Sequence, residues 1–222
     1  MKKAVLIIFF ISGLVNSQEK IIKSLGDFHE IKTYRGLEVE LIRSDSPKAI
    51  IEGEKSEEVI IKNTNGVLRI SMTVLETFSA DDAKVTIYFS KKIDVIDVNE
   101  GSAVSSEETF EQEKIELRSQ EAGSITLKVK TDQLEIKVIS GGEIETEGYS
   151  KNQNIKVNTG GIYKGKQLET EYTNVTSSTG SNATVNASKL VDANANLGAT
   201  ITIKGDPEEI KKKESLGGYI RE

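Results

Sequence analysis

Short runs of alternating apolar and polar residues fill most of this chain, and from about residue 95 they recur with a near-constant period. Ile155-Lys156-Val157 precedes a glycine, and Ile201-Thr202-Ile203 follows one. The recurring glycines are separated by 22, 19, 19, 19, 18 and 19 residues, at Gly101, Gly123, Gly142, Gly161, Gly180, Gly198 and Gly217. Alternation with a period of two is typical of strands with one buried face. A repeat near twenty residues is typical of a stacked β-solenoid.

Each repeat places apolar residues on both sides of its glycine. The inward candidates are Ile115, Leu117, Ile125, Leu127, Val129, Leu134, Ile136, Val138, Ile144, Ile155, Val157 and Tyr163, followed by the smaller Val175, Ala183, Val185, Ala187, Ala193 and Ala195. A single rung cannot bury its apolar face without neighbours above and below. We therefore predict an all-β fold, a short right-handed parallel β-helix, with the hand taken from the usual crossover preference. A β-sandwich with evenly spaced strands is the alternative.

The N-terminal third has a different pattern. Alternation over residues 28–42 predicts strands interrupted by a turn at Arg35-Gly36, and Asn65-Gly66 predicts a hairpin between runs 59–62 and 67–72. Two further strands are expected at 85–89 and 93–98, after a polar loop from Thr73 to Lys84. We therefore divide the chain into an N-terminal block of longer strands (18–94) and β-helix repeats (95–222), and expect 18–222 to form one continuous domain.

The two ends carry their own signals. Lys2 and Lys3 before an apolar run from Ala4 to Val15 predict a secretory signal peptide over residues 1–17. That run is shorter than the roughly 20 residues needed to span a bilayer, so we expect no membrane span in the mature chain. Near the other end, Pro207 predicts a short helical turn over residues 208–213, followed by a last strand at 216–220.

Composition narrows the function classes. The chain has no cysteine, which excludes disulfides, thiol catalysis and zinc–thiolate sites. Its formal net charge is −6, and removal of residues 1–17 with their two lysines leaves −8. Lys211-Lys212-Lys213 is the densest basic run, but Glu208, Glu209 and Glu214 flank it. Without a basic stripe, we expect no nucleic-acid partner.

Few residues suggest chemistry. His29 is the single histidine, and it has no recognisable nucleophile motif beside it. Asp94 with Asp97, or Asp81 with Asp82, could pair for acid–base work or calcium, but hydrolytic pairs must converge on a cleft. The Gly-Gly pairs at 141 and 160 lack the spacing of a phosphate loop and are interpreted as bends. We predict no catalytic, cofactor-binding or metal-binding residues, and no cofactor.

Several segments together resemble a known family. They are the strand block Phe28-His29-Glu30-Ile31 through Val39-Glu40-Leu41, the hairpin Asn65-Gly66-Val67-Leu68-Arg69-Ile70, and the rungs Ser140-Gly141-Gly142-Glu143-Ile144 and Thr159-Gly160-Gly161-Ile162-Tyr163. The pattern is similar to that of the putative auto-transporter adhesin, head GIN domain family of Bacteroidetes. The resemblance covers residues 28–220. It implies a β-helical, exported protein with an adhesin label, and it supplies no catalytic residues.

We therefore expect an exported, non-enzymatic binding protein of the adhesin type, in the periplasm or at the cell surface of a Gram-negative bacterium. Its partner would be a glycan or a cell-surface protein held on the outward faces of the rungs. Two alternatives stay open: a carbohydrate-active enzyme of the lyase or hydrolase type, and a structural envelope component that stacks edge to edge. The pattern leaves the ligand and the oligomeric state undetermined.

Overall fold

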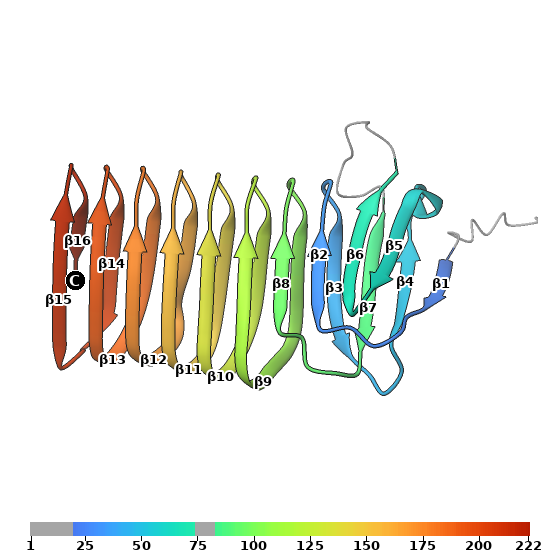
Figure 1. The fold of residues 1–222 in the computed structure, drawn as a ribbon, viewed down its shortest axis with the longest axis horizontal. Coiled ribbons are helices and arrows are strands. Elements are labelled where there is room, and N and C mark those ends of the chain that lie inside the picture. The colour runs from blue at the N-terminus through green and yellow to red at the C-terminus, as the bar shows by residue number, and fades with distance from the viewer. Residues whose placement is uncertain (1–19, 74–82) are drawn as a thin grey trace, which may run out of the picture.

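The computed structural model describes residues 20–73 and 83–222. The predicted signal peptide (1–17) and most of the polar loop predicted between Thr73 and Lys84 lie outside these residues. Within them, sixteen strands form one continuous sheet that winds into a β-solenoid (Figure 1). The predicted parallel β-helix is therefore confirmed.

Five long parallel strands make the body of the solenoid. Neighbours in the chain are neighbours in the sheet, and pairs such as Ile125 with Ile144 and Ile136 with Ile155 align coil on coil. The strands are β9 (Ala103–Ser119), β10 (Ser124–Val138), β11 (Glu143–Val157), β12 (Ile162–Ser177) and β13 (Asn182–Asn196). The last coils are made of shorter strands, β14 (Thr200–Gly205), β15 (Glu209–Ser215) and β16 (Tyr219–Arg221). β14 and β15 both pair with β13, and β16 pairs with β14.

From β8 (Val95–Val98) onward, each coil closes at one edge through a two-residue turn, and these turns form the row of sharp bends in Figure 1. Both turn residues have positive φ, for example 51° at Ser140 with 73° at Gly141, and 49° at Thr159 with 69° at Gly160. This is the backbone of a type I′ turn, which suits tight connections between strands. The turns stack because each donates to the next: the Gly141 N–H donates to the Thr159 carbonyl at 3.0 Å.

The recurring glycine of the sequence occupies two different structural positions. Gly101, Gly180, Gly198 and Gly217 are the second residue of the turn, where positive φ favours glycine. Gly123, Gly142 and Gly161 come one residue later, where a Cβ would lie only 2.5–3.0 Å from backbone oxygen of the preceding coil. The uneven steps between glycines arise partly from this change of position. The Gly-Gly pairs serve both positions at once and are bends, as predicted.

The N-terminal strands also join the stack, in an order that differs from the chain order. β2 (Glu30–Thr33) and β3 (Glu38–Arg43) lie between β8 (Val95–Val98) with β9 on one side and β6 (Val67–Met72) with β7 (Lys84–Phe89) on the other. All of these pairings are parallel. The chain therefore forms one coil with β2 and β3 and then the next coil outward with β6 and β7. It returns to the opposite side of the first coil with β8 and β9.

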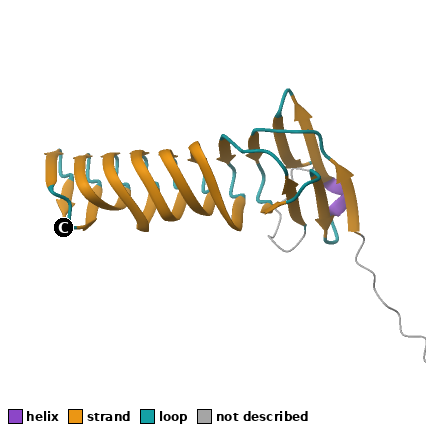
Figure 2. Ribbon diagram, turned by 90° about the horizontal axis from the view of Figure 1, so that it is seen from below, coloured by secondary structure: helices purple, strands orange, loops and turns teal. Residues whose placement is uncertain are grey.

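Antiparallel strands cover the outer end of this block, at the right of Figures 1 and 2. β5 (Val59–Thr64) pairs with β6 around the predicted Asn65-Gly66 turn, which confirms the hairpin. β4 (Lys48–Glu52) pairs with β7, and β1 (Lys20–Ser24) pairs with β4. The 3₁₀ helix η1 (Ser56–Glu58) lies between β4 and β5 in the chain. These elements cap the N-terminal end of the solenoid.

Two local predictions are wrong. The N-terminal strands have four to six residues and the strands of the solenoid body fifteen to seventeen, the reverse of the expected lengths. The long strands continue around the corners of each coil, where the alternation of apolar and polar residues is interrupted. A segment of regular alternation in the sequence is therefore shorter than the strand that contains it. Residues 209–215 form the strand β15 and not a helical turn, because pairing with β13 overrides the local preference.

A single apolar core runs through both parts of the molecule. Alternate residues of β10 are buried, including Ile125, Leu127 and Val129, and the buried residues at the start of β13 are the smaller Ala183, Val185 and Ala187. The predicted decrease in interior volume is found as far as β13, and Ile201 and Ile203 of β14 then bring large side chains back into the core. The solenoid interior is packed with side chains, so a ligand has to bind on its outer surface.

Candidate functional site

The alternation of inward and outward residues breaks at one corner of each coil. There, two successive residues face solvent: Glu113-Lys114 in β9, Asp132-Gln133 in β10 and Lys151-Asn152 in β11. Polar pairs therefore recur at the same place on adjacent coils and form a continuous outer corner. In a straight strand, two neighbouring residues point to opposite faces. Two neighbouring residues that both face solvent therefore show that the strand bends at this point.

Buried polar side chains hold the inside of this corner. Gln112, Thr131, Ser150 and Thr170 occupy paired positions on successive coils, and all four are buried. The Gln112 amide donates to the carbonyls of Ile93 (2.8 Å) and Lys114 (2.6 Å), and the Thr131 hydroxyl donates to Ser150 Oγ (3.1 Å). Buried polar groups need hydrogen-bond partners. This ladder of side chains supplies such partners where the strands bend, and it keeps the geometry of the corner constant from coil to coil.

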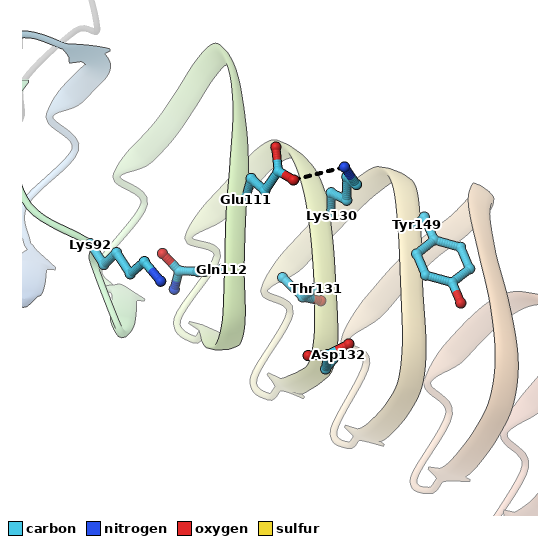
Figure 3. A pocket seen from close by; sticks show the side chains of 7 residues that line it. All are labelled: Lys92, Glu111, Gln112, Lys130, Thr131, Asp132 and Tyr149. Atoms are coloured by element: carbon cyan, nitrogen blue, oxygen red, sulfur yellow. Dashed lines mark hydrogen bonds and ion pairs between the residues drawn. The ribbon is translucent and has the colours of Figure 1, made fainter.

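A recess of about 320 Å³ lies on the outer side of the corner (Figure 3). Three adjacent coils and the segment before β8 contribute to it. We refer to it as the corner recess, and its lining residues are Lys92, Glu111, Gln112, Lys130, Thr131, Asp132 and Tyr149. Three of the other recesses have volumes of about 120, 300 and 260 Å³, and none of the residues that line these three is aromatic.

The charges of the corner recess balance. Lys130 Nζ lies 2.7 Å from Glu111 Oε1, an ion pair visible at the top of Figure 3. The hydrogen bond from Lys130 and its positive charge lower the pKa of the Glu111 carboxyl. Lys92 and Asp132 supply one further charge of each sign, and within the described part of the chain neither side chain has a hydrogen-bond or ion-pair partner. Both can therefore reach a bound molecule.

Tyr149 provides an aromatic surface beside these polar groups. It projects from β11 with 38% of its surface exposed, and its hydroxyl donates to Glu171 Oε1 at 2.8 Å. The hydrogen bond to Glu171 raises the pKa of Tyr149, and partial burial acts in the same direction. Glu171 also binds Lys189 Nζ at 2.6 Å, so the pKa of its carboxyl is lowered, first by Lys189 and then by Tyr149.

Among the described residues, the histidine and the aspartates that the sequence suggested for chemistry do not line the corner recess. His29 is exposed, and its ring packs against the hairpin turn at Gly66. Asp97 is buried beside Lys32, while Asp94 is exposed, so the two have different surroundings. Asp81 and Asp82 lie outside the described residues. Among the described residues, no three acidic or histidine side chains gather as a metal ion would require.

The prediction of no site residues did not anticipate the corner recess. One signal was available, since polar pairs such as Asp132-Gln133 and Lys151-Asn152 recur 19 residues apart. Alternation counted from Ile144 places Tyr149 outward, but it does not show which residues of the neighbouring coils lie beside its ring. Tyr163 was correctly placed inward and is buried, whereas Tyr149 faces solvent at the corner.

The model of the family described as putative auto-transporter adhesin, head GIN domain, matches residues 27–207. This chain belongs to that family. The match confirms the predicted resemblance, and it includes every residue of the corner recess. A search of curated proteins gave no match.

Solved structures share the fold. A putative adhesin from Bacteroides fragilis NCTC 9343 superposes with a TM-score of 0.82 at 17% identity, covering 93% of this chain and 97% of that one. A putative lipid binding protein from Parabacteroides distasonis ATCC 8503 has a TM-score of 0.66 at 18% identity, with coverages of 93% and 98%. A putative adhesin from Parabacteroides merdae ATCC 43184 has 0.64 at 14%, covering 93% and 97%. At these identities the likeness establishes the fold alone.

Proposed function

We propose that this chain is an exported, non-enzymatic binding protein of the adhesin type, and that its ligand contacts the corner recess. The observation that carries the proposal is the exposed ring of Tyr149 among polar side chains from adjacent coils. Binding sites commonly combine an aromatic surface with a few polar groups that orient the ligand. Tyrosine suits such a surface because it offers an apolar body with a polar tip.

The ionisation of the recess supports binding over hydrolysis. A general acid at neutral pH needs a carboxyl with a raised pKa. The carboxyl of Glu111 has a lowered pKa because it is bonded to Lys130, and that of Glu171, beside Tyr149, is lowered by Lys189. Both groups are therefore held as carboxylates, which accept hydrogen bonds but do not supply protons.

The family description supports the adhesin role. One neighbour bears the name of a putative lipid binding protein, but the corner recess is open and charged, which favours a polar ligand. The predicted signal peptide supports export to the periplasm or the cell surface. No helix in the described part of the chain is long and apolar enough to cross a membrane.

Binding of the purified chain to intact bacterial cells, epithelial cells and mucin-coated surfaces tests this proposal. We expect saturable binding that falls at least tenfold in Tyr149→Ala, because the aromatic surface is lost. Tyr219→Ala removes an exposed tyrosine at the C-terminal end and is the matched control. Absence of binding to every surface would refute the proposal, as would full binding by Tyr149→Ala. Release of sugar products from polysaccharides would instead support the enzyme alternative.

A further inference from the structure

We propose that the outer corner of the solenoid binds an uncharged oligosaccharide, with Tyr149 and Tyr172 as two successive stacking surfaces. This inference rests on the proposed function and names its ligand class. The tyrosines lie on adjacent coils, Tyr149 on β11 and Tyr172 on β12. They are exposed to nearly the same extent, 38% and 39%. We call the surface formed by Tyr149, Glu171, Lys189 and Tyr172 the corner strip.

One ion pair holds both rings of the corner strip. Glu171 accepts the hydrogen bond from the Tyr149 hydroxyl through one carboxylate oxygen and binds Lys189 through the other. Lys189 Nζ in turn lies 5.4 Å from the centre of the Tyr172 ring. The contacts link β11, β12 and β13. Tyrosine has few rotatable bonds and loses little entropy when a ligand binds, and here these contacts already restrain both rings.

The chemistry of the strip and the adjoining recess matches a sugar. The C–H face of a pyranose ring is apolar and stacks on an aromatic ring, while its hydroxyls donate and accept hydrogen bonds at the rim. Tyr149 belongs to both surfaces, so a molecule stacked on it also reaches the recess. There the unpaired Asp132 carboxylate can accept from sugar hydroxyls, and the Lys92 ammonium can donate to them.

The balance of charge selects an uncharged ligand. The corner recess holds two lysines and two acids, and the corner strip adds one lysine paired with one acid. A polyanion requires an excess of positive charge along its path, and the formal net charge of the chain is −6. Sulfated and uronic-acid polymers are therefore poor fits to this surface.

The outer corner runs from coil to coil along the solenoid, and this direction fits an extended chain of sugars. Paired strands are spaced by about 4.8 Å, so the ligand passes from one coil to the next within about one sugar unit. Tyr172 pairs with Asn152, three residues after Tyr149, so the two rings are also displaced around the corner. The ligand would cross the corner obliquely, and its affinity should increase with length until both rings are covered.

Isothermal titration of the purified chain tests the inference. The uncharged probes are hexasaccharides of glucose, mannose and N-acetylglucosamine, and the acidic probes are hexagalacturonic acid and heparin fragments. We expect at least one uncharged hexasaccharide to bind, with its disaccharide at least tenfold weaker. Tyr149→Ala and Tyr172→Ala should each lower the affinity at least fivefold. Tyr149→Phe, which keeps the ring, should lower it less, and Tyr219→Ala should leave it unchanged. Circular dichroism of each variant checks that the fold is intact.

Three results would overturn the inference. They are binding of acidic probes alone, binding of uncharged probes that neither alanine variant weakens, and no binding of any uncharged hexasaccharide. The cell-binding experiment separates this failure from that of the proposed function. A chain that binds cells through Tyr149 but binds no uncharged hexasaccharide keeps its adhesin role and loses this ligand class.

Discussion

The coil built on β10 and the coil that ends the solenoid differ in their interiors. Inward positions of β10 hold Ile125, Leu127 and Val129, all buried. In β15, Lys212 and Glu214 pair with the buried Ala193 and Ala195 of β13 and therefore take inward positions. The Lys212 ammonium contacts the Glu222 carboxylate, and Glu214 accepts from the Ile220 N–H at 2.6 Å.

The difference follows from the number of neighbours. A middle coil has a partner on both edges and can bury apolar side chains completely. A terminal coil leaves one edge unpaired, and an apolar coil there would attract another chain. Inward charges are one way in which β proteins prevent such pairing. At the opposite end, the antiparallel strands β1, β4 and β5 cover the stack instead. The two ends of one solenoid are thus closed by different means.

The largest effect on stability is expected from truncating buried apolar side chains in the middle coils. Leu127→Ala should lower the free energy of unfolding by about 2–5 kcal/mol, because it removes three buried carbons and leaves a cavity. Val185→Ala, at a fully buried position of the less voluminous β13 coil, should cost roughly 1.5 kcal/mol for two carbons. Urea unfolding measures both. Equal losses would contradict a cost that scales with the buried apolar volume removed.

A double variant can give the last coil the apolar inward residues of a middle coil. The double variant Lys212→Ile/Glu214→Val should associate at its C-terminal end, because its inward positions become apolar while its edges stay unpaired. Light scattering across a concentration series should show a larger mass than for the unmodified chain. Lys211→Ile/Lys213→Val changes outward positions of the same strand and is the control. A monomeric double variant would contradict the role given to these charges. Stacking of the unmodified chain would instead favour the structural envelope alternative.

The smallest effect is expected on the outer face. Arg118 makes a two-point hydrogen bond to Glu116, at 2.6 and 2.7 Å, and this bond lowers the pKa of the Glu116 carboxyl. A lowered folded pKa means that the stabilisation is present above the ordinary pKa of about 4.3 and is lost as pH falls through the folded value. Because the pair is partly exposed, Glu116→Gln should cost at most about 1 kcal/mol at pH 7.

Unfolding of Glu116→Gln at pH 7 and at pH 2.5 checks the sign. The difference from the unmodified chain should shrink at the lower pH, because protonation of Glu116 removes its charge-assisted bond to Arg118. Glu113→Gln, at an exposed position of the same strand, should have no effect at either pH. A difference as large at pH 2.5 as at pH 7 would show that the variant acts through packing and not through charge.

Much of the fold was predictable because it repeats. Alternation identified inward residues such as Leu127 and Val157, and the turn residues marked where coils end. The order of the N-terminal coils was not predictable, because β6 and β7 pair with strands far away in the sequence. The corner strip was missed for a similar reason. Tyr149 and Tyr172 are 23 residues apart, and only the pairing of β11 with β12 brings them to one surface.

The sequence by itself determined that this protein is a stack of coils. A period near nineteen with alternating apolar residues leaves each rung with a face that only other rungs can cover. It also determined where the chain turns, because few residues adopt positive φ without cost. The tertiary structure alone decided the rest. Glycine is required at Gly142 because the carbonyl of Ser119 lies where a Cβ would be, not because of its own φ. Lys212 takes an inward position and yet stays exposed because, among the described residues, no coil pairs with the far edge of β15. Tyr149 shares one surface with Tyr172 because β11 pairs with β12. Each of these properties depends on what lies across a strand pairing, and such neighbours are set by the fold.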